Sequence, residues 1–424
     1  MGIYFLVFAV CLLYYLVAGG NKRRAKDGRL LAIFFLYLAL FVGLGDMIGG
    51  YDRYIYGESF DYIADITWRD KNYANAIYLV NGNEYGYFVW QILLSFITTN
   101  RYVFILFTTI LIYALFYKSF VKYIDNYPFA CIVFLGMMFF FTMTYLRQMI
   151  AIGIAWQGIE HIWKRNTIRF FIYVALAATF HTAVLIFGII YFIPLKKYSK
   201  RSILWVLIAC LLIGLTPIPN MLLAGAGDTT GKTAGYTDQE QGFRIEYVLE
   251  VMFFIFIIFK NYNYISDDKK TLTFLNMCYT LCAILFVFMR FGQGGRFAWP
   301  FFLGILYMLP SLICQKRISY VNRGLVVCVF FGLFVRINNA WAPMQVPYKT
   351  FLTNGVPAGD GKIYNKFEYD DNYTINKFYR PAWETWPARP RVSPRCLLGA
   401  MGRPRGEAGR PAPPSGRAAP AAAR

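Results

Sequence analysis

The sequence has few charged residues, which make up 16% of its 424 positions, while hydrophobic side chains make up 58%. Soluble domains typically contain about 25% charged residues. A soluble chain of this length would need much more polar surface to cover itself. The composition therefore argues against an ordinary soluble enzyme and indicates a protein embedded in lipid.

Histidine is also scarce, and the cysteines do not cluster. The chain has two histidines and eight cysteines. The cysteines are scattered, with no CxxC pair and no Cys/His cluster. This pattern predicts neither a disulfide framework nor a metal site, and we expect no metal and no cofactor.

Acidic residues are too few to balance the basic ones, and the formal net charge is +20. In a soluble protein this excess would suggest a nucleic-acid partner. Here the basic residues lie mostly in short loops between apolar runs, so the positive-inside rule explains them better. We therefore expect a lipid bilayer, and no nucleic acid, as the partner of these charges.

Apolar runs of membrane-spanning length, about 20 residues, recur along the chain. They predict an all-α, polytopic transmembrane helical bundle of about ten spans, with additional re-entrant or interfacial half-helices. Residues 1–19 lack a basic segment before the apolar run, so no cleavable signal peptide is expected. The runs are 2–19, 30–49, 101–117, 128–145, 147–163, 202–219, 245–259, 271–289, 298–314 and 324–341.

Six short loops carry clustered Lys or Arg, and placing all six in the cytoplasm gives a consistent topology. These basic loops lie at 22–24, 118–122, 164–169, 196–201, 260–270 and 316–323. Both termini are then extracytoplasmic, and the outer turns fall near 46–100, 145–148, 179–182, 217–244 and 290–297. Two segments strain this scheme. Residues 84–99 are interpreted as an amphipathic helix on the outer side. Residues 168–193 are too short for two crossings, so they predict either two half-helices or one crossing with a basic outer loop.

Three regions follow from composition. Residues 1–350 form the predicted transmembrane domain, and residues 351–386 form a polar extracytoplasmic segment. Residues 387–424 are rich in Arg, Pro, Ala and Gly and cannot bury enough apolar surface to fold. Two interpretations of this tail stay open: a frameshifted or read-through end, or a basic disordered tail.

The predicted outer turns contain unusual polar residues. The stretch with Tyr51, Asp52, Tyr54 and Tyr56 suits a sugar-binding loop, because aromatic faces cover apolar sugar surfaces and carboxylates accept hydroxyl hydrogen bonds. An ordinary interfacial belt of tyrosines is the alternative. Glu84 comes shortly afterwards, and its alternative role is a first-turn helix acid.

Arg147 is the sharpest signal, because it lies inside an apolar stretch from Phe129 to Trp156. An ionisable residue there is costly and is functional by default, and a guanidinium suits phosphate. Snorkelling to lipid headgroups is the alternative. Gln148 beside it adds a neutral donor. His181, in the middle of another apolar run, is either a general base or phosphate donor, or a hydrogen-bonded core residue.

A glycine-rich turn at 290–297 contains Arg290 and Arg296. Its glycines allow close approach of the backbone to a ligand, but it is no nucleotide-binding loop, because no strand precedes it and no GKS/T follows. A flexible turn with interfacial arginines is the alternative. A Thr-Gly-Lys-Thr sequence at 230–233 resembles the end of a P-loop only superficially, and no nucleotide site is predicted there.

Taken in order, these residues resemble the EpsG family, which is similar to Wzy-type polysaccharide polymerases of bacterial envelopes. The resemblance spans about 2–350. Its most specific part is Arg147-Gln148 with Ala151, followed by Phe180-His181. The other matching positions are Asp52, Tyr56, Phe60, Glu84-Tyr85-Gly86-Tyr87, Arg296 and Pro347-Tyr348. The segment 290–297 departs somewhat from the family pattern, and the tail after about 387 matches nothing in it.

The resemblance implies a multi-pass protein of the bacterial cytoplasmic membrane that joins oligosaccharide units carried on polyprenyl diphosphate at the outer face. Such a step needs cations for the departing diphosphate and a base for the acceptor hydroxyl. Arg147, with Arg290 and Arg296, would supply the cations. Asp52, Glu84 or His181 would supply the base. Tyr51, Tyr54, Tyr56 and Tyr348 would contact substrate, without a metal.

The expected partners are the lipid-linked oligosaccharide, the bilayer, and a flippase and a chain-length regulator of the same pathway. Two other functions stay open. A flippase or exporter of lipid-linked oligosaccharide would more often show paired repeats, and no internal repeat is evident. A membrane acyltransferase acting on an exopolysaccharide would use His181 as base, but the re-entrant segment offers no acidic or histidine partner for it.

Overall fold

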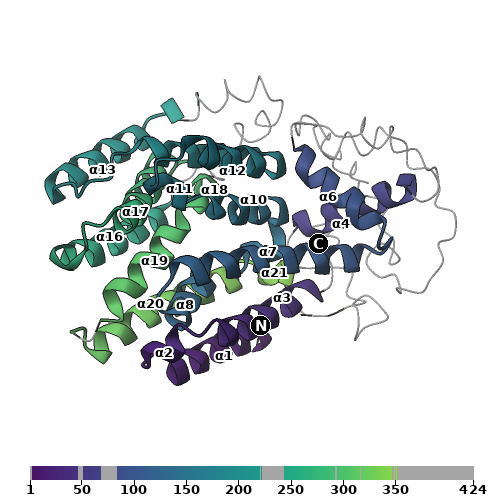
Figure 1. The fold of residues 1–424 in the computed structure, drawn as a ribbon, viewed down its shortest axis with the longest axis horizontal. Helices are drawn as coiled ribbons and strands as arrows, with labels where there is room; N and C mark the ends of the chain where they lie inside the picture. Colours follow the sequence, from purple (N-terminus) through teal and green to yellow (C-terminus); the bar gives the residue numbers. More distant parts are fainter. Residues whose placement is uncertain are drawn as a thin grey trace, which may run out of the picture.

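The computed structural model describes residues 2–45, 51–67, 84–219, 221, 243–291, 294–315, 317–345, 348 and 350. Within this part of the chain the regular structure is helical, and an isolated antiparallel bridge joins Gly45 to Thr350. The prediction of an all-α fold is confirmed (Figure 1). The segments 351–386 and 387–424 lie outside the described residues.

Over the described residues, each predicted apolar run contains a helix or consecutive helices. Several begin at a side-chain cap, such as Asn100, Asp268 and Ser319, whose oxygens accept backbone N–H groups of the first turn. The helices are α1 (Gly2–Ala18), α2 (Lys22–Ala25), α3 (Gly28–Gly43), α4 (Tyr51–Asp65), α6 (Tyr85–Ser95), α7 (Arg101–Tyr123), α8 (Tyr127–Met137), α9 (Phe141–Thr144), α10 (Leu146–Gln157), α11 (Glu160–Trp163), α12 (Thr167–Phe180), η2 (Thr182–Phe192), α13 (Lys200–Leu215), α16 (Ile245–Lys260), η3 (Tyr262–Tyr264), α17 (Lys269–Val287), α18 (Gly295–Ala298), η4 (Trp299–Phe301), α19 (Phe302–Ile313), α20 (Tyr320–Ala340) and α21 (Ala342–Gln345).

Fewer helices qualify as membrane spans than the sequence predicts. Among the described residues, four segments are both long and apolar enough: α7, α17, the continuous run Gly295–Ile313, and α20. Other apolar helices, including α1 and α3, have 10–17 residues. A 16-residue helix rises about 24 Å, less than the roughly 30 Å hydrocarbon core. The structure therefore supports a membrane protein but does not confirm about ten spans.

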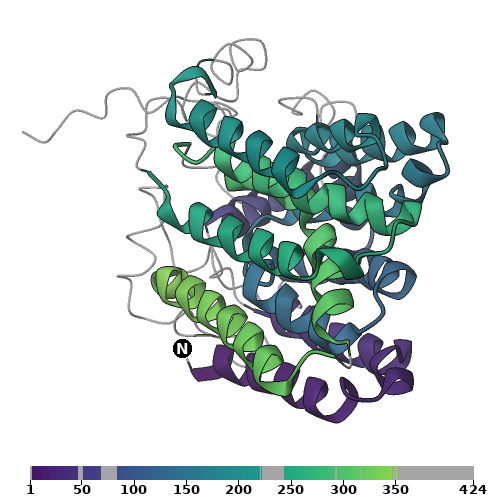
Figure 2. The ribbon, with the colours of Figure 1, turned by 90° about the vertical axis from the view of Figure 1, so that its left-hand side faces the viewer.

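Of the candidate spans, α17 and the run Gly295–Ile313 are the most buried, and α20 is the least buried. In the most apolar window of Gly295–Ile313, 83% of residues are buried, against 78% for α17 and 17% for α20. Neighbouring helices pack as α3 on α7, α10 on α12, α13 and α19 on α17, and α20 on α8. Figure 2 shows α20 at the edge of the bundle, below α16.

The basic loops gather at one end of the bundle, at the left of Figure 1. Salt bridges and hydrogen bonds link loops that are far apart in the sequence, which fits the prediction that these loops share one membrane side. That this side is the cytoplasm stays a prediction. The links are Lys26–Asp125 at 2.7 Å, Lys122–Glu160 at 2.9 Å, Lys197–Asp267 at 3.4 Å and Arg317–Asn261 at 2.8 Å.

The two segments that strain the topology are short helices. α6 has 11 residues, which is too few to cross a bilayer. α12 and η2 fold back on each other: the Arg165 guanidinium donates to the Tyr191 carbonyl at 3.0 Å, and the Phe170 and Tyr191 rings stack at 5.4 Å. Of the two predicted alternatives for 168–193, the structure has the pair of half-helices, and His181 lies at their turn.

Candidate functional site

Helix starts and breaks position the polar side chains of the end opposite the basic loops. Glu84 is the N-cap residue of α6, and Arg147 lies in the first turn of α10. His181 separates α12 from η2 with an extended backbone (φ −157°, ψ 116°). Arg296 lies in the short helix α18. Helix ends leave backbone groups without intrahelical partners, so polar side chains are best accommodated at these positions.

Glu84 is the centre of the cluster. Its Oε2 accepts from Arg147 Nη1 at 2.6 Å, and its Oε1 lies 3.0 Å from His181 Nδ1. The backbone N–H of Thr182 also donates to Oε1, at 3.3 Å. The Glu84 side chain is 7% exposed and the Arg147 side chain 35%. The carboxylate is thus held inside by three donors, while the arginine remains accessible.

The hydrogen-bond chemistry of Glu84 assigns the tautomer of His181. An ionised carboxylate only accepts hydrogen bonds, so Nδ1 of His181 carries the proton that it donates to Glu84. In the neutral ring, Nε2 is then an acceptor. It faces Nη2 of Arg296 at 3.5 Å. His181 therefore connects Glu84, the partner of Arg147, to Arg296.

Gln148 fixes the position of Arg296. Its side-chain oxygen accepts from Arg296 Nε at 2.8 Å, and its side-chain nitrogen donates to the Arg296 carbonyl at 2.8 Å. This pair of bonds determines the orientation of the amide. It also joins α10, which carries Arg147, to α18.

Aromatic rings flank both guanidinium groups. Arg147 lies over Tyr56 and Tyr87, with its carbon 5.2 and 5.9 Å from the ring centres, and its Nε donates to the Tyr56 hydroxyl at 3.3 Å. Arg296 lies over Tyr145 at 4.7 Å and Trp299 at 6.0 Å. Cation–π contacts hold each planar cation on a fixed surface.

Asp52 lies close enough to both arginines for its ionisation to respond to them. It belongs to α4, which lies outside the long apolar helices (Figure 1). Burial raises the pKa of Asp52, while the charges of Arg296 and Arg147 act in the opposite direction. The carboxyl group is therefore part of the same electrostatic cluster as Arg147.

Other predicted residues lie elsewhere or are not described. The Arg290 guanidinium donates to the Leu215 carbonyl at 3.0 Å, on the α13 side. Tyr348 donates to the Phe41 carbonyl at 2.7 Å and stacks on the Phe41 ring at 4.4 Å. The structure does not bring Arg290 or Tyr348 into the cluster. The side chains of Tyr51 and Tyr54 lie outside the described residues.

Sequence reasoning missed several residues that contact the cluster, namely Tyr145, Trp299 and Thr182, and it gave Tyr87 no role beyond a match to the family. Tyr145 and Trp299 had a weak signal, since they lie two residues before Arg147 and three after Arg296. Thr182 contributes only its backbone N–H, which no side-chain pattern reveals. In the described part of the chain, no three His, Cys, Asp or Glu side chains are placed to share a metal ion.

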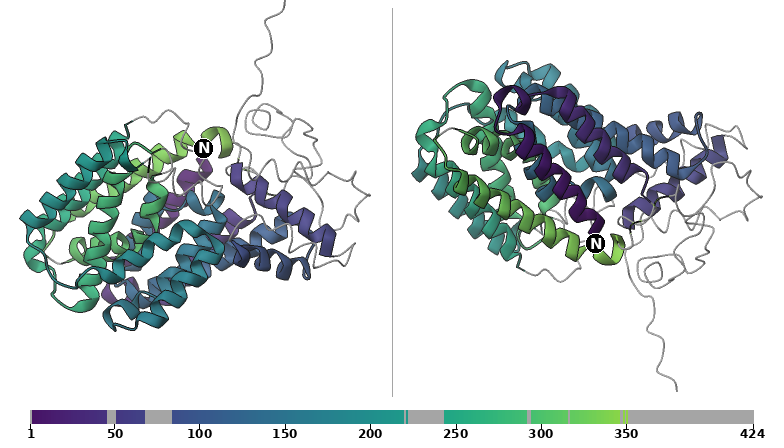
Figure 3. Two further views of the ribbon diagram at one scale, coloured as in Figure 1. Left: turned by 90° about the horizontal axis from the view of Figure 1, so that it is seen from above. Right: turned by 90° about the horizontal axis from the view of Figure 1, so that it is seen from below.

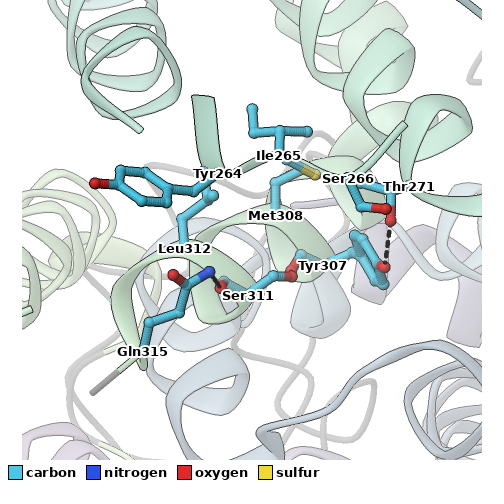
Figure 4. A pocket seen from close by; sticks show the side chains of 9 residues that line it. All are labelled: Tyr264, Ile265, Ser266, Thr271, Tyr307, Met308, Ser311, Leu312 and Gln315. Atoms are coloured by element: carbon cyan, nitrogen blue, oxygen red, sulfur yellow. Dashed lines mark hydrogen bonds between the residues drawn. The ribbon is translucent and has the colours of Figure 1, made fainter. Parts of the chain in front are cut away.

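A cavity of about 160 Å³ lies at the opposite, basic end, beside the start of α17 and the end of α19. Figure 4 shows Thr271 and Tyr307 joined by a hydrogen bond of 3.0 Å on its wall. None of the candidate residues lines it. Its other lining residues are Tyr264, Ile265, Ser266, Met308, Ser311, Leu312 and Gln315.

Fold and site together define a helical membrane protein with an Arg–Glu–His–Arg cluster at one end of its bundle. A family model described as "EpsG family" matches residues 28–350. The chain therefore belongs to the EpsG family, which the sequence motifs suggested. Comparison with curated proteins found no match, and comparison with solved structures found none either.

Proposed function

We propose that this protein is a polysaccharide polymerase that joins oligosaccharide units carried on polyprenyl diphosphate at the outer face of the bacterial cytoplasmic membrane. The observation that carries the proposal is the chain of contacts from Arg147 through Glu84 and His181 to Arg296. Family membership and the apolar helices support a membrane protein linked to polysaccharides. The reaction itself is argued from the site.

The two arginines suit a diphosphate. Each has a planar fork of donors, each rests on aromatic rings, and His181 and Gln148 hold them in neighbouring positions. In the proposed reaction the leaving group is a lipid diphosphate, and fixed cations stabilise the charge that develops on it. Arg147 binds it from one side and Arg296 from the other.

Of the three residues that the sequence offered as the base, Asp52, Glu84 and His181, we choose His181. Glu84 already accepts from Arg147, His181 and Thr182, so it serves to position the other groups. The acceptor hydroxyl oxygen forms a bond to the anomeric carbon of the donor sugar, and the bond from that carbon to the diphosphate oxygen breaks. The hydroxyl proton goes to Nε2 of His181 once Arg296 has turned toward the diphosphate.

Asp52 and the tyrosines of α4 suit the sugars. Tyr56 lies against Arg147, so a sugar bound beside α4 would have its anomeric carbon close to the bound diphosphate. Asp52 would accept hydroxyl hydrogen bonds. In the cell, a flippase would deliver the lipid-linked units, and a chain-length regulator would act on the product.

A membrane acyltransferase is the second candidate, and one observation favours it. The sequence offered no partner for His181 within its own segment, but the fold brings Glu84 to its Nδ1 at 3.0 Å. A His–carboxylate pair can activate a hydroxyl for acyl transfer. The two arginines favour the polymerase, because acyl transfer does not release a lipid-bound diphosphate.

Deletion of the gene in its native host tests the proposal. The expected result is loss of high-molecular-weight polysaccharide, with single repeat units accumulating on the lipid. Retention of full-length polymer that lacks acyl groups would support the acyltransferase instead. Loss of lipid-linked units from the outer face, with accumulation on the inner face, would indicate a flippase.

A further inference from the structure

A second charged cluster lies between α16 and α20, separate from the catalytic candidates. Arg336 of α20 contacts Glu246 of α16 at 2.8 Å and Glu250, one turn further along, at 3.9 Å. The side chains are 48%, 39% and 20% exposed, respectively. Both helices are otherwise strongly apolar. Ionisable residues within membrane helices are costly and mark functional positions.

The joint between these helices is sparse. α20 packs on α8, and α16 packs on α17 and α19. α16 and α20 meet through the Arg336 ion pairs and the Phe253–Phe330 rings, whose centres are 6.0 Å apart. Within a bilayer, helices are held together by close packing rather than by a hydrophobic driving force. This joint is therefore easier to open than one with closely packed helices.

The same joint leads to the proposed active site. At the start of α16, the Tyr247 hydroxyl accepts from the backbone N–H of Gly295, the residue before Arg296. At the end of α20, the Trp341 ring lies 6.1 Å from Tyr145, and Arg296 rests on Tyr145. Figure 3 (right) shows α20 on the outside of the bundle, facing the viewer. The ion pairs thus lie between the periphery and Arg296.

We infer that the α16–α20 joint is the lateral path by which the isoprenoid diphosphate substrate reaches Arg296 from the bilayer, and that Arg336 with Glu246 and Glu250 is its latch. This rests on the proposed function for the substrate class. The diphosphate must stay at the outer surface while the isoprenoid chain stays in lipid. Exposed apolar side chains on both helices suit that chain: Leu249, Met252 and Phe256 on α16, and Leu325 and Val329 on α20.

Reversible bridging tests the latch. Glu246→Cys and Arg336→Cys are combined in a chain that also carries Cys328→Ser and Cys396→Ser, and a reducible bis-methanethiosulfonate reagent joins them. Before bridging, the variant should make polymer, because nothing then opposes separation of the helices. Bridging should lower polymer formation at least tenfold, and reduction should restore it.

A matched bridge at the basic end is the control. Lys26 and Asp125 form an exposed ion pair of 2.7 Å between two loops, so Lys26→Cys with Asp125→Cys joins segments that the inference leaves in contact. This bridge should leave polymer formation unchanged. Normal polymer from a fully bridged α16–α20 joint would overturn the inference.

A second readout does not depend on polymer formation. A benzophenone-bearing polyprenyl diphosphate without sugars should label peptides from 245–260 and 320–340. The α16–α20 bridge should abolish labelling of the side chains that these helices turn toward each other. Labelling without any polymer from the unbridged protein would contradict the polymerase and leave the path standing. Polymer formation without labelling of either helix would overturn the path alone.

Discussion

Two arginine–carboxylate pairs lie toward the same end of the molecule, and they differ in access rather than chemistry. Arg101 of α7 contacts Asp61 of α4, and both side chains are 1% exposed. Arg147 contacts Glu84, and these side chains are 35% and 7% exposed. The first pair is sealed between helices. The second is open on the arginine side and shares its carboxylate with His181.

The difference shows why a buried charge alone does not identify a functional site. A sealed ion pair joins elements, and breaking it leaves an uncompensated charge in the interior. An accessible pair whose partners include a histidine can exchange its contacts for those of a substrate. We therefore expect changes in Arg101 to affect folding, and changes in Arg147 to affect activity in a protein that still folds.

Removal of Arg147 should have the largest effect. Losing one charge-assisted contact to the leaving group typically lowers a rate about 10²–10³-fold, so Arg147→Ala should abolish detectable polymer at a normal membrane level. Arg147→Lys keeps the charge without the fork and should retain part of the activity. Polymer length and protein level are measured together, by gel and immunoblot. Normal polymer from Arg147→Ala would mean that Arg147 contacts lipid headgroups and takes no part in the reaction.

Breaking the sealed pair should mainly reduce stability. Arg101→Met leaves Asp61 buried without this partner, which typically costs about 3–5 kcal/mol. We expect a lower membrane level and a lower melting temperature in detergent. Arg101→Met combined with Asp61→Leu should recover much of the loss, because neither charge of the pair is then left buried without the other. A double variant as unstable as the single one would mean that the pair does more than join α4 to α7.

Removing the Tyr145 ring, on which Arg296 lies, should have a smaller effect than removing Arg147 or Arg101. A cation–π contact contributes about 0.5–2 kcal/mol, so Tyr145→Leu should lower the rate of polymer formation about 2- to 30-fold. Tyr145→Phe keeps the ring and should behave as the unmodified protein does. Rates from labelled lipid-linked units distinguish the two. Equal losses in both variants would assign the effect to the hydroxyl.

At the opposite end, the exposed pairs around Glu160 should contribute least. Partial burial would raise the pKa of Glu160, but hydrogen bonds from Lys122 and Lys164 outweigh it and lower the pKa from 4.5. A carboxyl group whose pKa is lowered by folding stabilises the folded state when the pH is above its pKa in the unfolded chain. That stabilisation is lost as the pH falls through the pKa of the folded state. Glu160→Gln should cost about 0.2–1 kcal/mol at neutral pH and nothing well below 4.5. A cost that persists in acid would contradict an ion-pair origin.

Much of this arrangement was predictable from the sequence, because its strongest signals are local. Apolar length predicted the long apolar helices, and an isolated polar residue in an apolar run drew attention to Arg147 and His181. The stretch around Asp52, which was expected to be a loop, is instead the helix α4. The sequence could not predict what joins them. The partnership of Glu84 with His181 spans 97 positions, and nothing in the local pattern of either residue specifies it.

The sequence was least informative where a charge lies near the end of an apolar run. Arg101 and Arg336 each lie near a helix end, where an arginine usually contacts headgroups. Only the fold places Asp61 against the first and Glu246 against the second. The sequence also gave Arg296 and Arg290, two arginines of one turn, the same expected role. The bond to Gln148 distinguishes them.

Reconstitution tests the central claim most directly. The purified protein in liposomes is given a defined oligosaccharide on polyprenyl diphosphate, and the products are separated by size. The account predicts a ladder of polymer and free lipid diphosphate from the unmodified protein, and neither from Arg147→Ala or His181→Ala at equal amounts. A ladder of undiminished length and yield from both variants would contradict it.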